Sequence, residues 1–524
     1  MLFLKATLIK SLIYILIFIK LIKNAKNRYF DMDLNNDFEL IYRENRVQIQ
    51  NKKQIVSELR EKIGESNVST EKVDILAYTR DSSLISLNWT IEGKIAGLPE
   101  IITWPENADH ISEILEVANR EKIPVVPFAE GSGVVGGAIP VKGGIIIDMK
   151  RFNEIIGIND ENLTVTVQTG VNGMNLERYL NAKGYTGGHI PQSLYTSSIG
   201  GWIAHRAAGQ FSSKYGKIED MVLGMKVVLP TGEKIEFDPI ARAATGPQLD
   251  KYFIGNEGTL GIVTEATLKI WPYPEKRALV SYAFPTIEDS LNATREIMRE
   301  HLFPAVIRIY DADETARHFE HIEKAEDKVM TIFVCEGNER LVDLEESVTR
   351  EMCKKNSGVD CGEEPVEHWF ETRFKVTETS MFPPYKIVAD TIEVSVMWDN
   401  ASELYHSVLE EAGKVEGNLL VSAHISHFYP NGVGFYFTFG GVPGKGKTEF
   451  DFYKECWNAT IQATLDAGGS ISHHHGVGIN RSHWMDEEWD GGLEVMKKFK
   501  EVLDPNNIFN PGKIYKKTWN GGDE

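Results

Sequence analysis

The order of apolar and polar residues predicts strands that alternate with helices across residues 95–275. Residues 99–105 form an apolar run that ends at a proline, which predicts a strand. Residues 109–122 repeat apolar positions at spacings of three and four, which predicts an amphipathic helix. Residues 33–93 are polar and mixed, with one helical stretch near 57–63. The other elements of this half are predicted at 125–126, 145–147, 163–167, 173–182 and 221–229.

Longer helical repeats appear after residue 275, and apolar runs separate them. Helices are predicted at 287–301 and 340–355, and strands at 305–310 and 329–335. This pattern predicts an α+β domain in which helices cover an antiparallel sheet. A chain of 524 residues is too long for one hydrophobic core, so two or three domains are expected.

The first 31 residues form a hydrophobic and basic leader. Its uninterrupted apolar run, 11–19, is well short of the roughly 20 residues that span a bilayer. Three interpretations stay open: a helix on the membrane surface, a poor signal anchor, or translation upstream of a true start at Met32. We favour the last two over a true span. The protein is expected in the cytoplasm, with peripheral membrane contact through residues 1–30 as one option.

The charge and cysteine content exclude some classes of partner. The net charge is −20, from 56 Lys and Arg against 76 Asp and Glu, which argues against nucleic acid as a main partner. A small anionic substrate needs only a local basic cluster, so it stays compatible with this charge. The four cysteines form no CxxC pair, so an iron–sulfur or zinc-ribbon module is not expected. So few cysteines in so long a chain fit a reducing compartment.

A glycine-rich loop lies between the two β-branched runs at 125–126 and 145–147. Glycine permits positive φ and close approach of the backbone to a ligand, and successive free amides form a concavity that suits an anion. An ordinary glycine-rich connection is the alternative. The loop is neither a Walker A motif nor a dinucleotide fingerprint. Its glycines are Gly131, Gly133, Gly136 and Gly137.

Residues 127–136 (PFAEGSGVVG) resemble the pyrophosphate loop of FAD-binding PCMH-type flavoproteins, the vanillyl-alcohol-oxidase superfamily, whose pattern is Pro-x-Gly-x-Gly-Thr-Ser-x-x-Gly. Ala129 stands in place of the first glycine, and Ser132 keeps the hydroxyl. Neither His nor Cys occupies the loop, so a covalent flavin link is not expected there. Two more segments, 196–204 (TSSIGGWIA) and 257–265 (EGTLGIVTE), follow in the order and spacing of the family.

The resemblance covers residues 95–515 and implies non-covalently bound FAD. It implies the pyrophosphate near 131–137 and the isoalloxazine near 188–201 and 257–261. The implied cofactor contacts are Pro127, Glu130, Gly131, Ser132, Gly133, Gly136, Gly137, Gly188, Pro191, Ser193, Ser197, Ser198, Gly200, Gly201, Trp202, Ala204, Glu257, Gly258, Thr259, Gly261 and Ile262.

The resemblance also implies the fold class and the domain order. The fold class is α+β, with a PCMH-type FAD-binding domain of two α/β subdomains and a C-terminal cap domain of the FAD-linked oxidase type. Residues 32–94 form an extension before the FAD-binding domain at 95–275. The cap domain occupies 276–515, and its last segment, 499–513, is expected to return to the flavin.

Several short segments are similar to those of the alkyldihydroxyacetonephosphate synthase branch. They are GHIPQS at 188–193, YGKIEDMV at 215–222, PAVIR at 304–308, YPNG at 429–432 and SHHHGVG at 472–478. This similarity implies exchange of the acyl chain of an acyl-dihydroxyacetonephosphate for a fatty alcohol, through a bond between flavin and substrate and without net oxidation. Residues 398–400 (WDN, where that branch has WDR) and 190–193 (IPQS, where it has ExPDS) depart from its pattern.

The D-2-hydroxyacid dehydrogenases for lactate or glycolate share both domains and are the alternative enzyme. A non-enzymatic FAD-binding or scaffold protein is a third class. It is disfavoured because such a protein has no need for so many reactive side chains. The partner expected in either enzyme class is a small anionic or lipid-phosphate substrate, and a homodimer is also expected as one option.

The resemblance assigns roles to particular side chains. Tyr429 takes the substrate proton, the histidines stabilise anionic intermediates, and Arg308 orients charged groups. Each residue also has a purely structural alternative. Tyr429 could be a core aromatic residue, the histidines a solvated run, and Arg308 a partner in a surface ion pair. The implied catalytic residues are Tyr429, His473, His474, His475, His189 and Arg308, and the substrate contacts are Arg308, Arg373 and Arg481.

No metal site is predicted at the histidine run. His473 and His475 are expected to share one face of a strand. Three consecutive side chains are not expected to converge on one ion, however, and no carboxylate–histidine pair stands nearby in the sequence.

Overall fold

The computed structural model describes residues 39–42, 46–375 and 387–515. The predicted leader lies outside these residues. In the described ranges, no helix is both long and apolar enough to cross a bilayer.

Besides two small two-stranded pairings, the described part of the first half contains two main sheets. The smaller has the strand order β2 (Val68–Ser69), β4 (Ile101–Thr103), β6 (Ile145–Asp148) and β5 (Val125–Phe128), and β6 runs parallel to both β4 and β5. The larger is antiparallel, in the order β11 (Lys234–Phe237), β10 (Val222–Val228), β12 (Ile262–Lys269), β8 (Thr164–Gln168) and β7 (Ile155–Asn159). The predicted strands and the α/β character of this half are confirmed.

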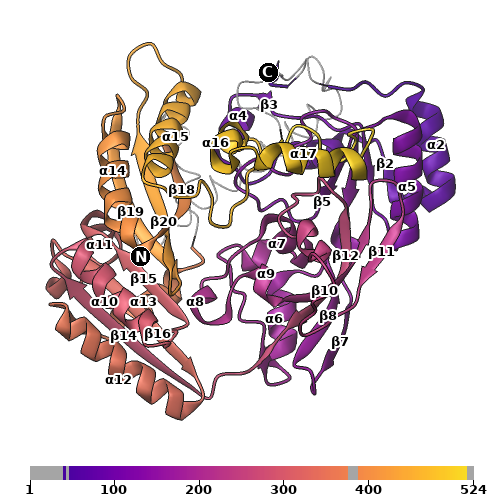
Figure 1. The fold of residues 1–524 in the computed structure, drawn as a ribbon. Coiled ribbons are helices and arrows are strands. Elements are labelled where there is room, and N and C mark those ends of the chain that lie inside the picture. The colour runs from indigo at the N-terminus through magenta and orange to yellow at the C-terminus, as the bar shows by residue number, and fades with distance from the viewer. Residues whose placement is uncertain (1–38, 43–45, 376–386, 516–524) are drawn as a thin grey trace, which may run out of the picture.

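Helix α5 (Ala108–Glu121) illustrates how local sequence sets these elements. The side chain of Asn107 accepts the N–H of His110 and so caps the first turn. Its predicted apolar positions are buried, and they pack with α2 (Lys52–Ile63) and β6 in one cluster. Figure 1 shows α2 and α5 side by side at the outer edge of this half.

Two stretches contain more structure than their sequence patterns predicted. Residues 33–93 add helices α3 (Lys72–Ala77) and α4 (Leu84–Ile91), and β2 pairs with β4. The small-residue stretch after 188 holds α7 (Ile199–His205), α8 (Ser212–Tyr215) and α9 (Ile218–Met221). Elements this short show little periodicity, and tertiary contacts stabilise them.

The second half is built on a seven-stranded antiparallel sheet, as predicted. Its order is β17 (Val359–Gly362), β14 (Lys276–Phe284), β16 (Val329–Gly337), β15 (Val306–Tyr310), β19 (Asn418–Phe428), β20 (Gly432–Gly441) and β18 (Val388–Met397). Figure 1 shows α10 (Ile287–Arg299), α12 (Glu339–Lys355) and α14 (Ala401–Gly413) on the side away from the first half. Helix α15 (Glu449–Asp466) packs beside α14, and its Phe450 contacts Trp89 of α4 in the first half.

Alternation along β20 separates a dry face from a polar face. Phe435, Phe437 and Phe439 are buried in the cluster that includes residues of α14 and α15. Tyr436 lies between two of them in the sequence and therefore points to the opposite face. That face looks toward the first half of the chain, where α8 contacts β15 and β19.

The end of the chain returns to the first half. Helix α17 (Gly492–Leu503) lies over the first half in Figure 1, and Phe509 then forms a β-bridge with Val125. The buried amide of Asn510 donates to the carbonyl of Gly137 at 2.8 Å and to that of Glu257 at 2.7 Å. One side chain thus joins the glycine loop to the 257–265 segment.

Replacement of Asn510 by alanine is expected to loosen this junction. It leaves two buried carbonyls without a donor, at a cost of about 1–3 kcal/mol each. We expect a lower urea midpoint and faster loss of bound cofactor. Asn507→Ala is the matched control, because Asn507 is exposed and also has a positive φ, 48° against 37° at Asn510. Equal effects of the two changes would attribute the loss to backbone strain instead.

Candidate active site

The glycine loop, residues 127–137, packs too tightly for side chains at several positions. Gly131 and Gly136 have φ of 67° and 79°. A Cβ at Gly137 would lie 2.8 Å from Nε2 of His205, and one at Gly136 would collide with Ile479. Protein side chains therefore pack closely against the loop, and one of them comes from the far end of the chain. The predicted close approach of this loop to a ligand stays a prediction.

Glu257 connects the first half to the turn that follows the histidine run. Its two carboxylate oxygens accept the backbone N–H groups of Val477 at 2.6 Å and of Gly478 at 2.8 Å. Glu257 itself has a φ of 50°, which an ordinary residue adopts only under constraint. The motif at 257–265 and the SHHHGVG motif therefore meet at this carboxylate, although Val477 comes 220 residues after Glu257 in the sequence.

In the small-residue segment at 196–204, some polar groups form hydrogen bonds within the segment itself. Nε1 of Trp202 donates to Oγ of Ser197 at 2.8 Å, and Ser198 caps α7 by accepting the N–H of Gly201. Both hydroxyls were predicted to contact the cofactor. In the structure they hold the turn and helix that carry the adjacent backbone.

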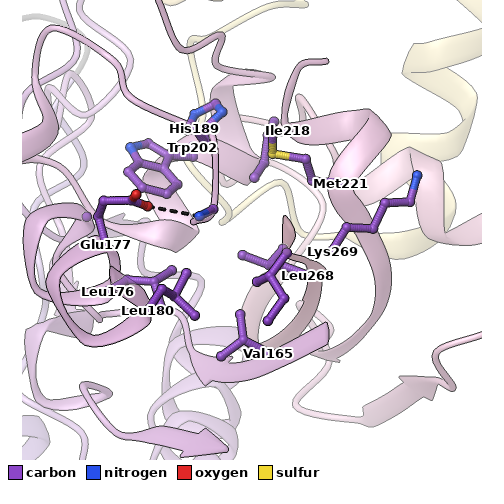
Figure 2. Close-up of a pocket in the computed structure, with 13 residues that line it drawn as sticks. Val165, Leu176, Glu177, Leu180, His189, Trp202, Ile218, Met221, Leu268 and Lys269 are labelled. Carbon is purple, nitrogen blue, oxygen red and sulfur yellow. Dashed lines mark hydrogen bonds between the residues drawn. The ribbon is translucent and has the colours of Figure 1, made fainter. Parts of the chain in front are cut away.

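His189 lies apart from the other predicted catalytic residues. It packs against Trp202 at 4.4 Å between ring centroids and lines a small cavity with Leu176 and Leu180, shown in Figure 2. Burial lowers its pKa to about 3, so the ring is neutral. Neither ring nitrogen has a hydrogen-bond partner among the described residues. We do not carry His189 forward as an acid or base.

The three consecutive histidines lie in a turn, and the buried carboxylate of Glu393 on β18 holds that turn. It accepts the backbone N–H groups of His473, of His474 at 3.2 Å and of His475 at 2.8 Å. Two expectations are corrected here: His473 and His475 do not share a strand face, and a carboxylate does lie nearby. Sheet pairing of β18 with β20 places Glu393 there, which local sequence does not reveal.

Arg481 is fully buried and supports the same turn. Its guanidinium lies 3.1 Å from a carboxylate oxygen of Glu393 and donates to the carbonyl of Gly476 at 3.0 Å. Burial opposes ionisation of Glu393, but Arg481 and the backbone N–H groups outweigh it, so its pKa lies below the ordinary value. With its charge paired in this way, Arg481 is not carried forward as a substrate contact.

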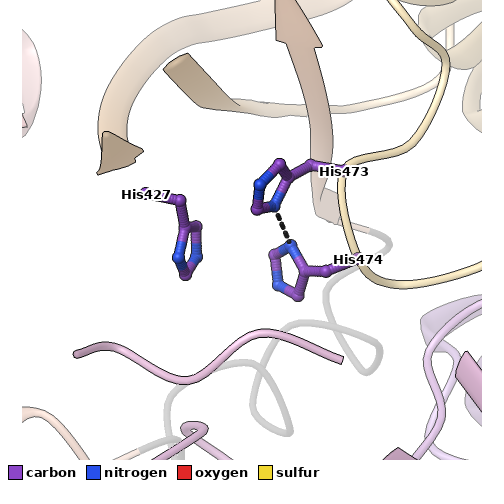
Figure 3. Close-up of side chains that lie close together, drawn as sticks. All are labelled: His427, His473 and His474. Atoms are coloured by element: carbon purple, nitrogen blue, oxygen red, sulfur yellow. Dashed lines mark hydrogen bonds between the residues drawn. The ribbon is translucent and has the colours of Figure 1, made fainter. Parts of the chain in front are cut away.

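A third imidazole joins the turn from β19. Figure 3 shows His427 facing His473 and His474, and one nitrogen from each of the three rings lies within 4.8 Å of the others. A register shift between Ser426 and Phe428 and a φ of 64° aim His427 into the site, as a β-bulge does. The expectation that only the three consecutive histidines could serve as metal ligands is corrected, because His427 joins them from strand β19. The prediction of no bound metal stays a prediction.

Burial keeps these imidazoles uncharged. It lowers the pKa of His427, His473 and His474 well below the ordinary value. The cation Lys217 adds to the effect at all three rings, and Arg308 adds to it at His427. The ammonium of Lys217 also donates to the carbonyl of His473. The neutral rings can therefore accept hydrogen bonds at neutral pH.

Two tyrosines complete the cluster. The hydroxyl of Tyr429 lies 2.9 Å from Nε2 of His473, so the structure brings together two residues that the sequence predicted to act together. The hydroxyl of Tyr436 lies 2.9 Å from Nε2 of both His474 and His427. Tyr436 was not predicted as a site residue. The sequence did contain one indication of its role, because Tyr436 is the polar residue between the buried phenylalanines of β20.

The two remaining arginines converge on one aromatic ring. Arg308 lies 6.0 Å and Arg373 lies 5.1 Å from the centroid of Trp369. Nε of Arg308 donates to the hydroxyl of Tyr310 at 2.9 Å, and burial lowers the pKa of Arg373 to about 10. Each guanidinium lies against the Trp369 ring, and a planar guanidinium is a group that binds phosphate or carboxylate.

Two family models match the chain, one described as an FAD binding domain at residues 99–238 and the other as the C-terminal domain of FAD linked oxidases at 273–514. An uncharacterized FAD-linked oxidoreductase of Escherichia coli (strain K12), YgcU, is 34% identical over 80% of this chain and 89% of its own length. The chain belongs to the FAD-linked oxidase family. Its cofactor is FAD, as predicted.

Alkyldihydroxyacetonephosphate synthases are among the other relatives of this chain. The alkyldihydroxyacetonephosphate synthase of Caenorhabditis elegans is 32% identical over 80% of this chain and 76% of its own length. A solved alkyldihydroxyacetonephosphate synthase structure matches with a TM-score of 0.74 at 26% identity, covering 89% of this chain and 87% of that one. These matches confirm the predicted family resemblance and the α+β fold class.

The residues around the glycine loop fit a polar cofactor. Oδ2 of Asp81 and Nε2 of His205 are buried, and within the described part of the chain neither has a hydrogen-bond partner. A Cβ on Gly133 would lie 3.7 and 3.5 Å from these two atoms, so they border the loop. Lys513 is also buried here, and its pKa falls to about 7 because of burial. FAD would be held by this loop and these side chains.

Replacement of Glu393 by glutamine is expected to disorder the histidine turn. The amide keeps the shape but leaves Arg481 as an unpaired buried charge, which typically costs about 3–5 kcal/mol. We expect a clear fall in the urea midpoint followed by tryptophan fluorescence. Glu410→Gln is the control, because that exposed carboxylate pairs only with Lys414 on its own helix. An unchanged midpoint in Glu393→Gln would mean that the carboxylate does not hold the turn.

Proposed function

We propose that this enzyme exchanges the acyl chain of an acylated dihydroxyacetone phosphate for a fatty alcohol. The ester C–O bond at the substrate carbon breaks, a new C–O bond to the alcohol forms, and the alcohol's proton ends on the released acid. No electrons are gained or lost overall. FAD, when bound, supplies the ring at which the substrate carbon is held during the exchange.

The observation that carries this proposal is the contact between Tyr429 and His473 inside a buried cluster of neutral imidazoles. Exchange at a carbon next to a ketone requires removal and return of a proton. Burial raises the pKa of Tyr429, so its hydroxyl keeps its proton at neutral pH and its anion is a strong base. The neutral ring of His473 can accept the hydrogen bond of this phenol at 2.9 Å.

The arginine pair supports a phosphorylated substrate. Arg308 and Arg373 lie against Trp369, and the planar guanidinium group binds phosphate oxygens through two parallel hydrogen bonds. The relatives support the same choice. Alkyldihydroxyacetonephosphate synthases of Dictyostelium discoideum and Trypanosoma brucei brucei are 28% and 29% identical over 88% of this chain.

Oxidation of a D-2-hydroxyacid is the second candidate. The glycolate oxidase subunit GlcD of Bacillus subtilis (strain 168) is 27% identical over 89% of this chain and 97% of its own length. Arg308 could orient a carboxylate as well as a phosphate, and the imidazoles could accept a hydroxyl proton. This reaction passes two electrons to an acceptor, which separates it from exchange.

The test uses purified FAD-loaded enzyme, acyl-dihydroxyacetonephosphate and labelled hexadecanol. We expect labelled ether product and free fatty acid in equal amounts. Tyr429→Phe should lower kcat by about 10²–10⁴-fold, the usual contribution of a positioned acid or base. Tyr282→Phe is the control, because its hydroxyl contacts Asp360 elsewhere on the same sheet. Turnover of D-lactate or D-glycolate with a dye acceptor, and no ether product, would contradict the proposal.

A further inference from the structure

The cluster of histidines and tyrosines extends beyond the groups that touch a substrate. Oγ of Ser212, on α8 in the first half of the chain, lies 2.6 Å from Nδ1 of His427. His427 continues to Tyr436 at 2.9 Å through its other ring nitrogen. The line of hydrogen bonds therefore crosses from one domain to the other before it reaches the histidine turn.

We propose that six side chains form one proton relay that begins at Tyr429 and ends at Ser212. Its members, in order, are Tyr429, His473, His474, Tyr436, His427 and Ser212. The five links measure 2.9, 3.0, 2.9, 2.9 and 2.6 Å. This inference rests on the proposed function, because it assigns Tyr429 as the group that exchanges a proton with the substrate.

Proton counting shows that the relay can conduct. A neutral imidazole carries one donor and one acceptor nitrogen, and a hydroxyl can donate and accept at once. When Tyr429 donates to Nε2 of His473, the proton of His473 must lie on Nδ1, where it meets Nδ1 of His474. His474 then donates from Nε2 to Tyr436. Every link in this direction holds one proton, and none is left empty.

The far half of the relay follows the same rule. Tyr436 donates to Nε2 of His427, and His427 donates from Nδ1 to Ser212. If one proton arrives on the oxygen of Tyr429, each proton advances by one link and one leaves the oxygen of Ser212. All six groups are neutral before and after. The three rings have exchanged tautomers, and a second transfer in reverse restores them.

The surroundings favour passage of the proton over its storage. Burial and the cations Lys217 and Arg308 disfavour a charged imidazole at His427, while Glu393 and His475 face the turn from the other side. Ser212 is buried, and its hydroxyl lies near enough to lower the pKa of Tyr429 against the larger effect of burial. The two ends of the relay therefore lie close together.

This arrangement suits an exchange reaction. A proton removed at Tyr429 reappears beside it at Ser212, where it can serve the departing acid, and the reverse transfer returns one in the second half of the cycle. After each transfer, the tautomers of the relay must be restored by a transfer in the opposite direction. This property suits a reaction that both removes and returns a proton.

The test cuts the relay at its middle and at its end. Tyr436→Phe and Ser212→Ala leave Tyr429 and His473 in place, and each should lower kcat by about 10²-fold with KM nearly unchanged. In mixtures of H₂O and D₂O, the wild-type rate should depend on deuterium content along a curve, as for several moving protons. Both variants should give a straight line. Ser213→Ala is the control, because Ser213 only accepts the N–H of Phe428.

A second readout does not need turnover. Nitrogen NMR of ¹⁵N-histidine enzyme should show coupled neutral tautomers at His427, His473 and His474, which Tyr436→Phe uncouples. Wild-type kcat and a curved deuterium dependence in both variants, with Tyr429→Phe inactive, would overturn the relay and leave the proposed function standing. A stoichiometric transition metal on these rings would also overturn it, because the metal would use the required lone pairs. If the enzyme oxidises hydroxyacids instead, the NMR result still decides on the relay.

Discussion

The buried carboxylate of Glu393 is the interaction on which the active site depends. A turn that presents three successive side chains to a site also presents three successive N–H groups, and those groups need acceptors when they are buried. The carboxylate oxygens of Glu393 are these acceptors, and Arg481 balances the negative charge of Glu393. Glu257, from the opposite domain, does the same for the N–H groups of Val477 and Gly478. The histidine turn is therefore fixed between a carboxylate of each domain.

Burial gives this site its chemical character. The imidazoles stay neutral, the tyrosines keep their protons, and Lys217 and the two arginines provide the positive charge. A neutral, hydrogen-bonded interior can move protons without building up charge. Under the proposed function, the guanidiniums of Arg308 and Arg373 hold the anionic group of the substrate. The separation of these two tasks follows from the alternation of β20 and β19, which places aromatic residues on the helix side and polar ones on the other.

Much of this architecture was predictable from the sequence, and the failures have physical causes. The apolar repeat of α5, the glycine loop and the antiparallel cap sheet follow from local patterns, and short motifs paired Tyr429 with His473. Glu393 and Ser212 could not be predicted, because sheet register and domain contact bring them to the site from 80 and 215 residues away. His427 depends on a bulge with positive φ, and no local pattern announces it. The catalytic role of His189 stays a prediction, because its ring packs on Trp202 and neither ring nitrogen has a hydrogen-bond partner among the described residues.

The most direct measurement of the central claim is the flavin spectrum under anaerobic conditions, with acyl-dihydroxyacetonephosphate, D-lactate and D-glycolate each added separately to the FAD-loaded enzyme. The account predicts that the acylated ketone phosphate alone perturbs the spectrum, releases fatty acid and passes no reducing equivalents to an added acceptor. Full bleaching by a hydroxyacid that persists until an acceptor is added would contradict it.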